Sequence, residues 1–218
     1  MDIEKRYIYI ILSQTPTKFG WLIRKVAKQN YNHVSIAFDE KLEEMYSFAR
    51  CQNKTPIVGG MVKEFPERFS LGKVEYVPVQ IYRLEVEEEM YLAGKDFTLA
   101  IYEDQEYLYN LFSALTFPLF HGFRTFKAYT CSEFAAHFLL FMGFHLKNEK
   151  RISAYTPEDI GICFKDDLFY EGNLLTYSDI ESKEAEHFFE ELGRIQIMKK
   201  SMFVLFQLCY RRIRLCGL

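Results

Sequence analysis

The first third of the sequence carries patterns typical of β-strands. Residues 7–12 form an apolar run that a Ser-Gln-Thr-Pro turn signal ends, which predicts a buried strand. Alternating side chains at 33–38 predict a second strand, and 45–49 is expected to return beside it as a hairpin. Residues 59–64 follow a glycine turn as a further strand, and the alternation over 74–86 predicts a long one.

Helical spacing of apolar residues dominates the rest of the chain. Helices are predicted over 17–29, 87–102, 103–117 and 131–143, with a capped helix start at Thr156. A last strand is predicted over 170–178. The predicted strands come first in the chain, with local hairpins, and most of the helices follow. This order favours an α+β domain with a mainly antiparallel sheet over a doubly wound parallel one.

The composition indicates a folded protein and excludes a disordered one. Of the 218 residues, 49% are hydrophobic and 17% aromatic, which is enough for a substantial core. We expect one domain over residues 1–180 and an appended segment over 181–218. The net charge of -3 gives no indication of a nucleic-acid partner.

The N-terminal segment and the cysteines point to a cytoplasmic protein. No small-residue cleavage site follows the first apolar run, so we expect a strand there and not a signal peptide. No uncharged apolar stretch of about 18 residues occurs, so no membrane-spanning helix is expected. Five irregularly spaced cysteines favour reduced thiols over a disulfide framework. Neither CxxC nor HExxH occurs, so we expect no structural zinc site and no zincin.

Cys131 stands at the beginning of a predicted helix, where a thiol can act as a nucleophile. First-turn amides and the helix dipole favour the thiolate, which is the reactive form. Phe134, Phe138 and Met142 form one apolar stripe, so the helix is expected to be buried with Cys131 at the edge of the core. His137 lies about 240° around the helix from Cys131, so the base must come from elsewhere.

His33 is the candidate base. It shares one face of its predicted strand with Ser35 and Ala37, and these small residues leave room for a helix end or a substrate. An imidazole that titrates near neutral pH is suited to accept the thiol proton and to return it to a leaving group.

Two residues are candidates for a third group that orients the His33 imidazole. Ser47 lies on the returning strand and Glu64 on the next one, and a carboxylate would also stabilise the imidazolium. The register of the strands decides between them, and it stays open at this point. For a developing oxyanion, the candidate donors are the Tyr129 hydroxyl and the Cys131 backbone amide.

Structural roles are the alternative for all of these residues. A cysteine in an apolar helix is usually a small buried hydrophobe. Tyr129 and Ser47 fit core or turn positions, and Glu64 fits a solvated surface. The other four cysteines lack a comparable context.

Four short segments resemble the permuted papain-like members of the NlpC superfamily, the YiiX/YaeF-like amidases. They are residues 32–37 (NHVSIA), 45–50 (MYSFAR), 59–64 (GGMVKE) and 129–134 (YTCSEF). The resemblance covers roughly residues 5–180, with the His strand before the Cys helix, which is the reverse of the order in papain.

The resemblance implies a papain-like core with Cys131 as nucleophile and His33 as base. The implied reaction is hydrolysis of an amide, ester or thioester through an acyl-enzyme, on a small peptide, amide or lipid-like substrate. Such a reaction requires no metal and no organic cofactor. The family places its third polar residue on the strand after the His, where the nearest match here is Ser47. Two alternatives stay open: a non-enzymatic module that binds a small ligand or lipid, and a membrane-associated thiol acyltransferase.

The C-terminal segment 194–218 contains six basic residues and no acidic one. On a helical projection six of its polar residues fall within an arc of about 120°, and the remaining face is broad and apolar. The six are Gln196, Lys199, Lys200, Gln207, Arg211 and Arg214. This pattern suits an anionic membrane surface or a partner protein. The alternatives are a helix that docks on its own domain and, for 202–208, a strand.

Overall fold

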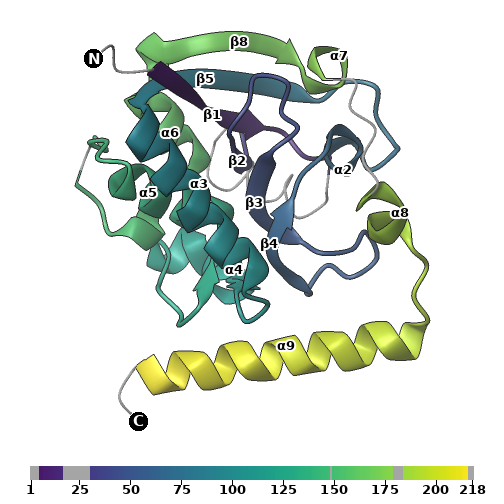
Figure 1. Ribbon diagram of the computed structural model, residues 1–218. Helices are drawn as coiled ribbons and strands as arrows, with labels where there is room; N and C mark the ends of the chain where they lie inside the picture. The colour runs from purple at the N-terminus through teal and green to yellow at the C-terminus, as the bar shows by residue number, and fades with distance from the viewer. Residues whose placement is uncertain (1–4, 17–29, 148, 179–183, 216–218) are drawn as a thin grey trace.

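A single mixed β-sheet organises the part of the chain that the computed structural model describes, residues 5–16, 30–147, 149–178 and 184–215 (Figure 1). The strands are β1 (Lys5–Ser13), β2 (His33–Ala37), β3 (Met45–Arg50), β4 (Gly59–Lys63), β5 (Pro78–Glu87), β6 (Leu108–Tyr109), β7 (Ala128–Tyr129) and β8 (Leu168–Asn173). The helices are α2 (Pro66–Ser70), α3 (Glu88–Glu103), α4 (Leu111–Phe120), α5 (Cys131–Phe141), α6 (Pro157–Cys163), α7 (Leu174–Tyr177), α8 (Glu184–Phe189) and α9 (Arg194–Leu215). Short 3-10 turns at Ile152–Ala154 and Lys165–Asp167 flank α6.

The sheet is antiparallel over most of its width. Its strand order is β7-β6-β4-β3-β2-β1-β5-β8, and neighbouring strands run antiparallel except β6 with β7. Short connections join β2, β3 and β4, and such connections can link only antiparallel neighbours. The predicted strands at 7–12, 33–38, 45–49, 59–64 and 74–86 correspond to β1 to β5. The predicted α+β class is confirmed.

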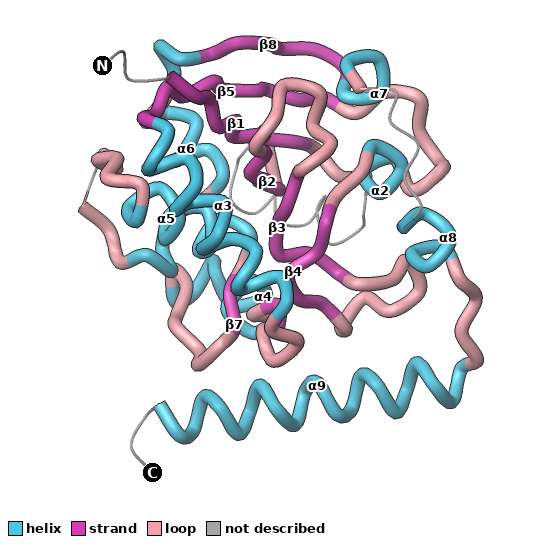
Figure 2. The backbone as a smooth tube through the Cα atoms, in the orientation of Figure 1, coloured by secondary structure: helices cyan, strands magenta, loops and turns pink. Residues whose placement is uncertain are grey.

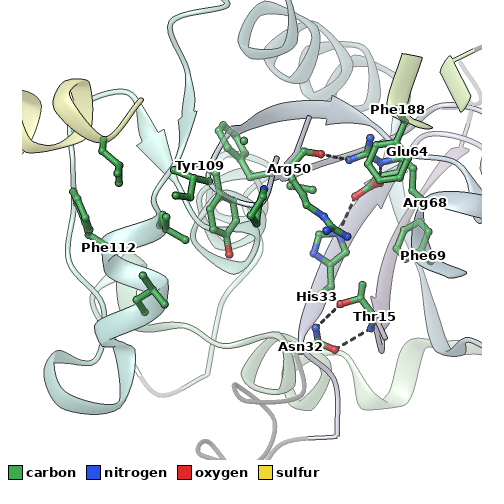
Figure 3. A pocket seen from close by; sticks show the side chains of 18 residues that line it. Thr15, Asn32, His33, Arg50, Glu64, Arg68, Phe69, Tyr109, Phe112 and Phe188 are labelled. Atoms are coloured by element: carbon green, nitrogen blue, oxygen red, sulfur yellow. Dashed lines mark hydrogen bonds and ion pairs between the residues drawn. The ribbon is translucent and has the colours of Figure 1, made fainter. Parts of the chain in front are cut away.

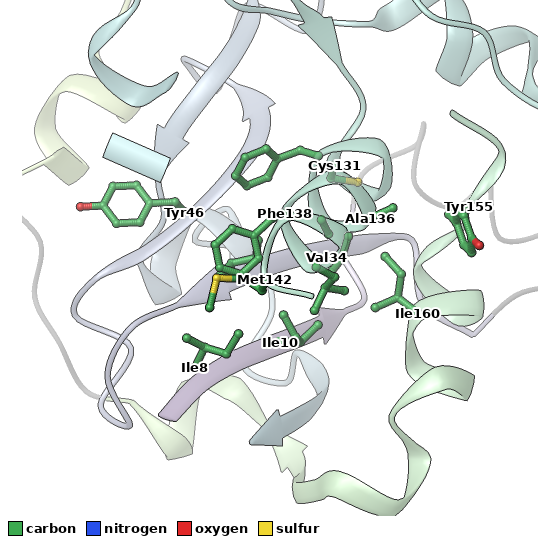
Figure 4. Close-up of a cluster of buried hydrophobic side chains, with 14 of the residues drawn as sticks. Ile8, Ile10, Val34, Tyr46, Cys131, Ala136, Phe138, Met142, Tyr155 and Ile160 are labelled. Carbon is green, nitrogen blue, oxygen red and sulfur yellow. The ribbon is translucent and has the colours of Figure 1, made fainter. Parts of the chain in front are cut away.

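Helices cover both faces of the sheet, as Figures 1 and 2 show. The larger core lies under α3, α5 and α6, where Ile10 and Val34 pack with Phe138 (Figure 4). The opposite face carries a smaller core, in which Ile11 packs with Phe69 of α2. Successive strand residues point to opposite faces, so the continuous apolar run in β1 supplies both cores.

The predicted helix over 103–117 is wrong in its first half. The chain leaves α3 after Glu103, forms the short strand β6 and begins α4 only at Leu111. The Asn110 side chain accepts a hydrogen bond from the Ser113 amide at 3.3 Å. This cap ends the strand and starts the helix, a local effect that apolar periodicity does not reveal.

The predicted strand over 170–178 is also too long. β8 ends at Asn173, whose side-chain oxygen accepts a hydrogen bond from the Leu175 amide at 3.2 Å and so begins α7. The helix predicted over 17–29 lies outside the described residues, and so does the predicted domain boundary at 180.

The C-terminal segment contacts the domain at two separate places. In α8, Phe188 packs on Phe65, with ring centroids 6.0 Å apart. Farther on, α9 lies along the outside of the domain (Figure 1) and buries Val204 and Leu208 against it. Residues 202–208 are helical, so a strand is excluded there. Among the described residues, no helix has both the length and the apolar character needed to span a membrane.

Candidate active site

Cys131 is the first residue of α5, and a reciprocal cap fixes this helix start. The Thr130 hydroxyl accepts a hydrogen bond from the Glu133 amide at 3.1 Å, and the Glu133 carboxylate accepts one from the Thr130 amide at 3.4 Å. The cap therefore holds the Cys131 side chain where first-turn amides and the helix dipole favour an anion. Cys131 is 5% exposed and belongs to the larger core (Figure 4).

The N-terminal end of α5 meets the beginning of β2. The helix packs on the face of β2 that carries Val34 and other large apolar side chains. The helix end was expected over the small residues Ser35 and Ala37, and this expectation is corrected. The helix packs on the Val34 face because the larger side chains there offer more apolar area to bury. The Val34 amide lies near the Cys131 sulfur and helps to lower the pKa of the thiol. His33, the first residue of β2, is thereby brought to the thiol.

Cys131 and His33 change each other's pKa in the directions of a thiolate–imidazolium pair. Burial lowers the pKa of His33, but the charge and hydrogen bond of Cys131, followed by those of Glu64, outweigh burial and raise this pKa to about 10. Burial raises the pKa of Cys131, but His33 and the amides of Val34 and Ser132 outweigh burial and lower this pKa. The arrangement therefore favours transfer of the thiol proton to the imidazole.

A buried carboxylate lies against Nε2 of His33. His33 Nε2 lies 2.9 Å from Glu64 Oε1 and 3.1 Å from Ser47 Oγ, and the Ser47 hydroxyl donates to the same Glu64 oxygen at 2.5 Å. Arg68 Nε donates to the second Glu64 oxygen at 2.6 Å. Burial raises the pKa of Glu64, but Arg68, His33 and Ser47 outweigh it and lower this pKa to about 2. Both candidates for the third residue therefore contact the imidazole, and Glu64 is the charged one.

The register of β3 and β4 brings Ser47 and Glu64 together. Ser47 pairs with Val62, and the Glu64 amide donates to the Met45 carbonyl at 2.7 Å just beyond the paired residues. Alternate residues of a strand share a face, so Glu64 follows Val62 onto the side of Ser47. A shift of one residue would have turned the carboxylate away from the imidazole.

Tyr129, predicted as an oxyanion donor, has another partner. Its hydroxyl lies 3.3 Å from His137 Nδ1, and its ring stacks on Tyr107 with centroids 5.9 Å apart. The tyrosine that borders the thiol is Tyr109, the residue paired with Tyr129 across β6 and β7. Burial and then the charge of Cys131 raise the pKa of Tyr109. The residue that lies beside the thiol is therefore Tyr109, whereas the Tyr129 hydroxyl points to His137.

Two cavities adjoin this cluster. The larger has a volume of about 440 Å³ and is lined by His33 and Glu64 at one end (Figure 3). Its wall is mainly apolar and includes Phe48, Ile57, Leu111, Phe112, Phe188 and Leu205. The smaller, about 50 Å³, is lined by Cys131. Tyr109 and Asn32 line both cavities, so they lie where the two meet.

Two arginines line the larger cavity beside the carboxylate. Arg68 also donates to the Arg50 carbonyl at 2.5 Å and stacks over the Phe188 ring at 4.2 Å. Arg50 donates to the Asn53 carbonyl at 3.2 Å, and burial followed by Arg68 lowers the pKa of its guanidinium. The polar end of the cavity is therefore cationic, while the opposite wall is apolar.

Sequence reasoning missed Arg68 and Tyr109. Glu64 ends a predicted strand and lies between β4 and α2, so helical spacing did not indicate its ion pair with Arg68. Tyr109 fell within a predicted helix, so its place in a strand beside the thiol was hidden. Sequence patterns gave Asn32 no role of its own, yet its side chain donates to Thr15 Oγ1 at 2.7 Å and lines both cavities.

Within the described ranges, no group of three or more His, Cys, Asp or Glu side chains comes together as a metal site. The four cysteines in those ranges are free thiols. No family model matches the sequence, and neither a curated protein nor a solved structure matches it. The residues of the site themselves therefore have to support any functional assignment.

Proposed function

We propose that the protein is a cysteine hydrolase in which Cys131 is the nucleophile, His33 the general base and Glu64 the group that orients His33. One observation carries the proposal: a single buried imidazole joins a thiol at a helix N-terminus to a buried carboxylate. This is the arrangement that activates a cysteine for attack on a carbonyl.

The resemblance to the permuted papain-like enzymes supports the same roles. His33 on a strand precedes Cys131 on a helix, which is the permuted order, and Ser47 stands on the strand after the His. A papain-like fold is part of the proposal. In this protein Ser47 shares the place beside the His33 imidazole with Glu64, whose carboxylate adds a negative charge there.

The reaction proceeds in two halves. The Cys131 thiolate attacks the carbonyl carbon, a C–S bond forms and the carbonyl electrons move to oxygen. As the tetrahedral intermediate collapses, the His33 imidazolium gives its proton to the leaving amine, alcohol or thiol. His33 then takes a proton from water, which attacks the acyl-enzyme and releases the acid and the thiolate. The Cys131 amide and the Tyr109 hydroxyl are the donors nearest to a developing oxyanion.

The larger cavity favours a substrate with an apolar acyl group. Its volume of about 440 Å³ and its wall of aromatic and aliphatic side chains are typical of pockets for small organic ligands. An acyl chain along Phe112 and Leu111 would place its carbonyl at the polar end, beside His33. The adjoining small cavity leaves space for the attacking sulfur and the leaving group.

Alkylation and ester hydrolysis test the proposal together. Iodoacetamide should modify Cys131 well below pH 8, faster than the exposed Cys209, with peptide mapping to assign each site. Purified protein should hydrolyse p-nitrophenyl esters and prefer a longer acyl chain to acetate, and Cys131→Ala should abolish turnover. Alkylation of Cys131 at the rate of an ordinary thiol, together with no turnover, would overturn the proposal.

A binding module is the second candidate, and one observation favours it. The larger cavity is lined by His33, whereas Cys131 lines the much smaller one. In a binding module the larger cavity would hold an apolar ligand and the thiol would stay unreacted. Retention of a fluorescent fatty acid by both the wild type and Cys131→Ala, without hydrolysis of any ester, would favour this function.

A further inference from the structure

The outward face of α9 is apolar, although it faces solvent. On the inner side Val204 is 5% exposed and Leu208 is fully buried against the domain. Large side chains on the other side are half to two thirds exposed: Ile195, Met198, Met202, Phe203, Phe206, Tyr210 and Ile213. An amphipathic helix on a domain normally presents its polar residues to water. This helix presents apolar residues on both sides.

The exposed residues form one continuous stripe. At about 100° per residue, Ile195, Met202, Phe206 and Ile213 fall within an arc of about 40°. Leu208 lies roughly on the opposite side of the helix from Phe206, at about 160°. The stripe therefore extends along most of α9, and its length exceeds what scattered surface hydrophobics produce.

Contacts on the inner side fix the direction of this stripe. The Arg211 guanidinium donates to the carbonyls of Glu106 and Lys127, and Arg212 donates to the carbonyl of Arg124 at 2.8 Å. These bonds attach the C-terminal half of α9 to the loops around β6 and β7. The apolar stripe is consequently held outwards, and it does not simply rotate into the domain.

Charge indicates what the stripe contacts. Residues 194–218 carry six basic residues and no acidic one, whereas the chain as a whole has a net charge of -3. Arg194, Lys199 and Arg214 are exposed on or beside the stripe. A second copy of α9 would bring like charges together, while an anionic lipid surface offers acyl chains for the apolar residues and headgroups for the cations.

We propose that α9 docks the protein on an anionic lipid bilayer, lying in the interface with its outward stripe in the headgroup region. No helix among the described residues can span a bilayer, so the association is peripheral. The inner side of the same helix contributes Leu205 to the wall of the larger cavity. Docking therefore brings this wall close to the membrane, and the proposal is independent of whether Cys131 performs hydrolysis.

Co-sedimentation of the full-length protein with vesicles tests the docking. The wild type should sediment with phosphatidylcholine vesicles that contain phosphatidylglycerol, and much less with vesicles of phosphatidylcholine alone. High salt should reduce its binding to the anionic vesicles. Met202→Ser/Phe206→Ser should weaken vesicle binding at least about tenfold, because two apolar side chains that would be buried in the bilayer are lost. The matched control is Leu92→Ser, which removes a side chain 51% exposed on α3 and should bind like the wild type.

A tryptophan at the stripe gives a second readout. The chain contains one Trp, so the wild-type emission can be subtracted. Phe206→Trp should shift its emission to shorter wavelength on anionic vesicles, and Leu92→Trp should not.

Three results would overturn the proposal. The first is wild-type protein that stays in the supernatant with anionic vesicles. The second is equal binding to neutral and anionic vesicles, and the third is a double serine variant that binds like the wild type. A dimer in light scattering that the double variant dissociates would show that the stripe joins two copies of the chain.

Discussion

The His33 cluster and α9 depart in opposite ways from the usual partition of polar and apolar side chains. In the cluster, His33 and Glu64 are charged groups enclosed in the domain, with 8% and 4% of their surface exposed. On α9, large apolar side chains such as Phe206 face water at 69% exposure. Both arrangements cost free energy unless partners compensate.

The difference lies in where the partners are. Every oxygen of the Glu64 carboxylate has a donor from the same chain, from Ser47, His33 and Arg68. The apolar stripe of α9 lacks such cover from the described residues, since more than half of each of its side chains is exposed. A departure compensated within the chain is what the proposed chemistry requires, whereas an uncompensated one is what the proposed membrane contact requires.

Removing the imidazole tests the cluster most severely. His33→Ala should lower ester turnover by about 10²- to 10⁴-fold, because the variant loses the proposed acceptor of the thiol proton and donor to the leaving group. It should also slow alkylation of Cys131 at neutral pH. The control is His137→Ala, whose ring contacts Tyr129 and should leave the rate within about twofold. Equal losses in both variants would contradict the assignment of the base.

Removing the carboxylate charge separates orientation from stability. Glu64→Gln leaves the buried Arg68 without its counter-charge and should cost about 3–5 kcal/mol in the free energy of unfolding, measured by urea denaturation. Glu64→Gln/Arg68→Met should regain much of that stability without regaining turnover. Recovery of both properties would show that Glu64 has only a structural role.

Acid should destabilise the protein through the same carboxylate, to a smaller extent. The pKa of Glu64 is lowered from 4.5 to about 2, so its contribution to stability is fully present above pH 4.5 and is lost as the pH falls towards 2. Unfolding free energies measured across this interval should decrease in the wild type and change less in Glu64→Gln/Arg68→Met. Identical slopes would mean that other carboxylates dominate acid unfolding.

The two sides of α9 should respond differently to truncation. Leu208→Ala should cost about 2–4 kcal/mol in unfolding free energy because Leu208 is fully buried. Phe206→Ser should change it by no more than about 0.5 kcal/mol, because the ring leaves few contacts behind in the folded protein. Similar losses from both variants would imply that the outward stripe is covered within the chain.

Sequence periodicity predicted the strands around the site well because these strands are local features. Residues 33–38, 45–49 and 59–64 carry their alternation in a few neighbouring positions, and the structure confirms all three. The element boundaries were less predictable. Single side-chain caps at Asn110 and Asn173 decided them, and a cap is one hydrogen bond within otherwise similar sequence.

The members of the site were only partly predictable. Cys131 and His33 could be proposed because a helix start and a small-residue strand are local patterns. The choice between Ser47 and Glu64 depended on strand register, which is a long-range property. The place of Tyr109 beside the thiol depends on the parallel pairing of β6 and β7, which brings together residues from different parts of the chain.

The sequence by itself determined the α+β class, the helix start at Cys131, the strand that begins at His33 and the basic, apolar composition of α9. Each of these follows from residues within a few turns or strand repeats of one another. Tertiary structure alone decided that the thiol, imidazole and carboxylate converge, and that α9 turns one apolar face inwards and the other to solvent. Contacts between distant segments depend on register and packing, which no local pattern encodes.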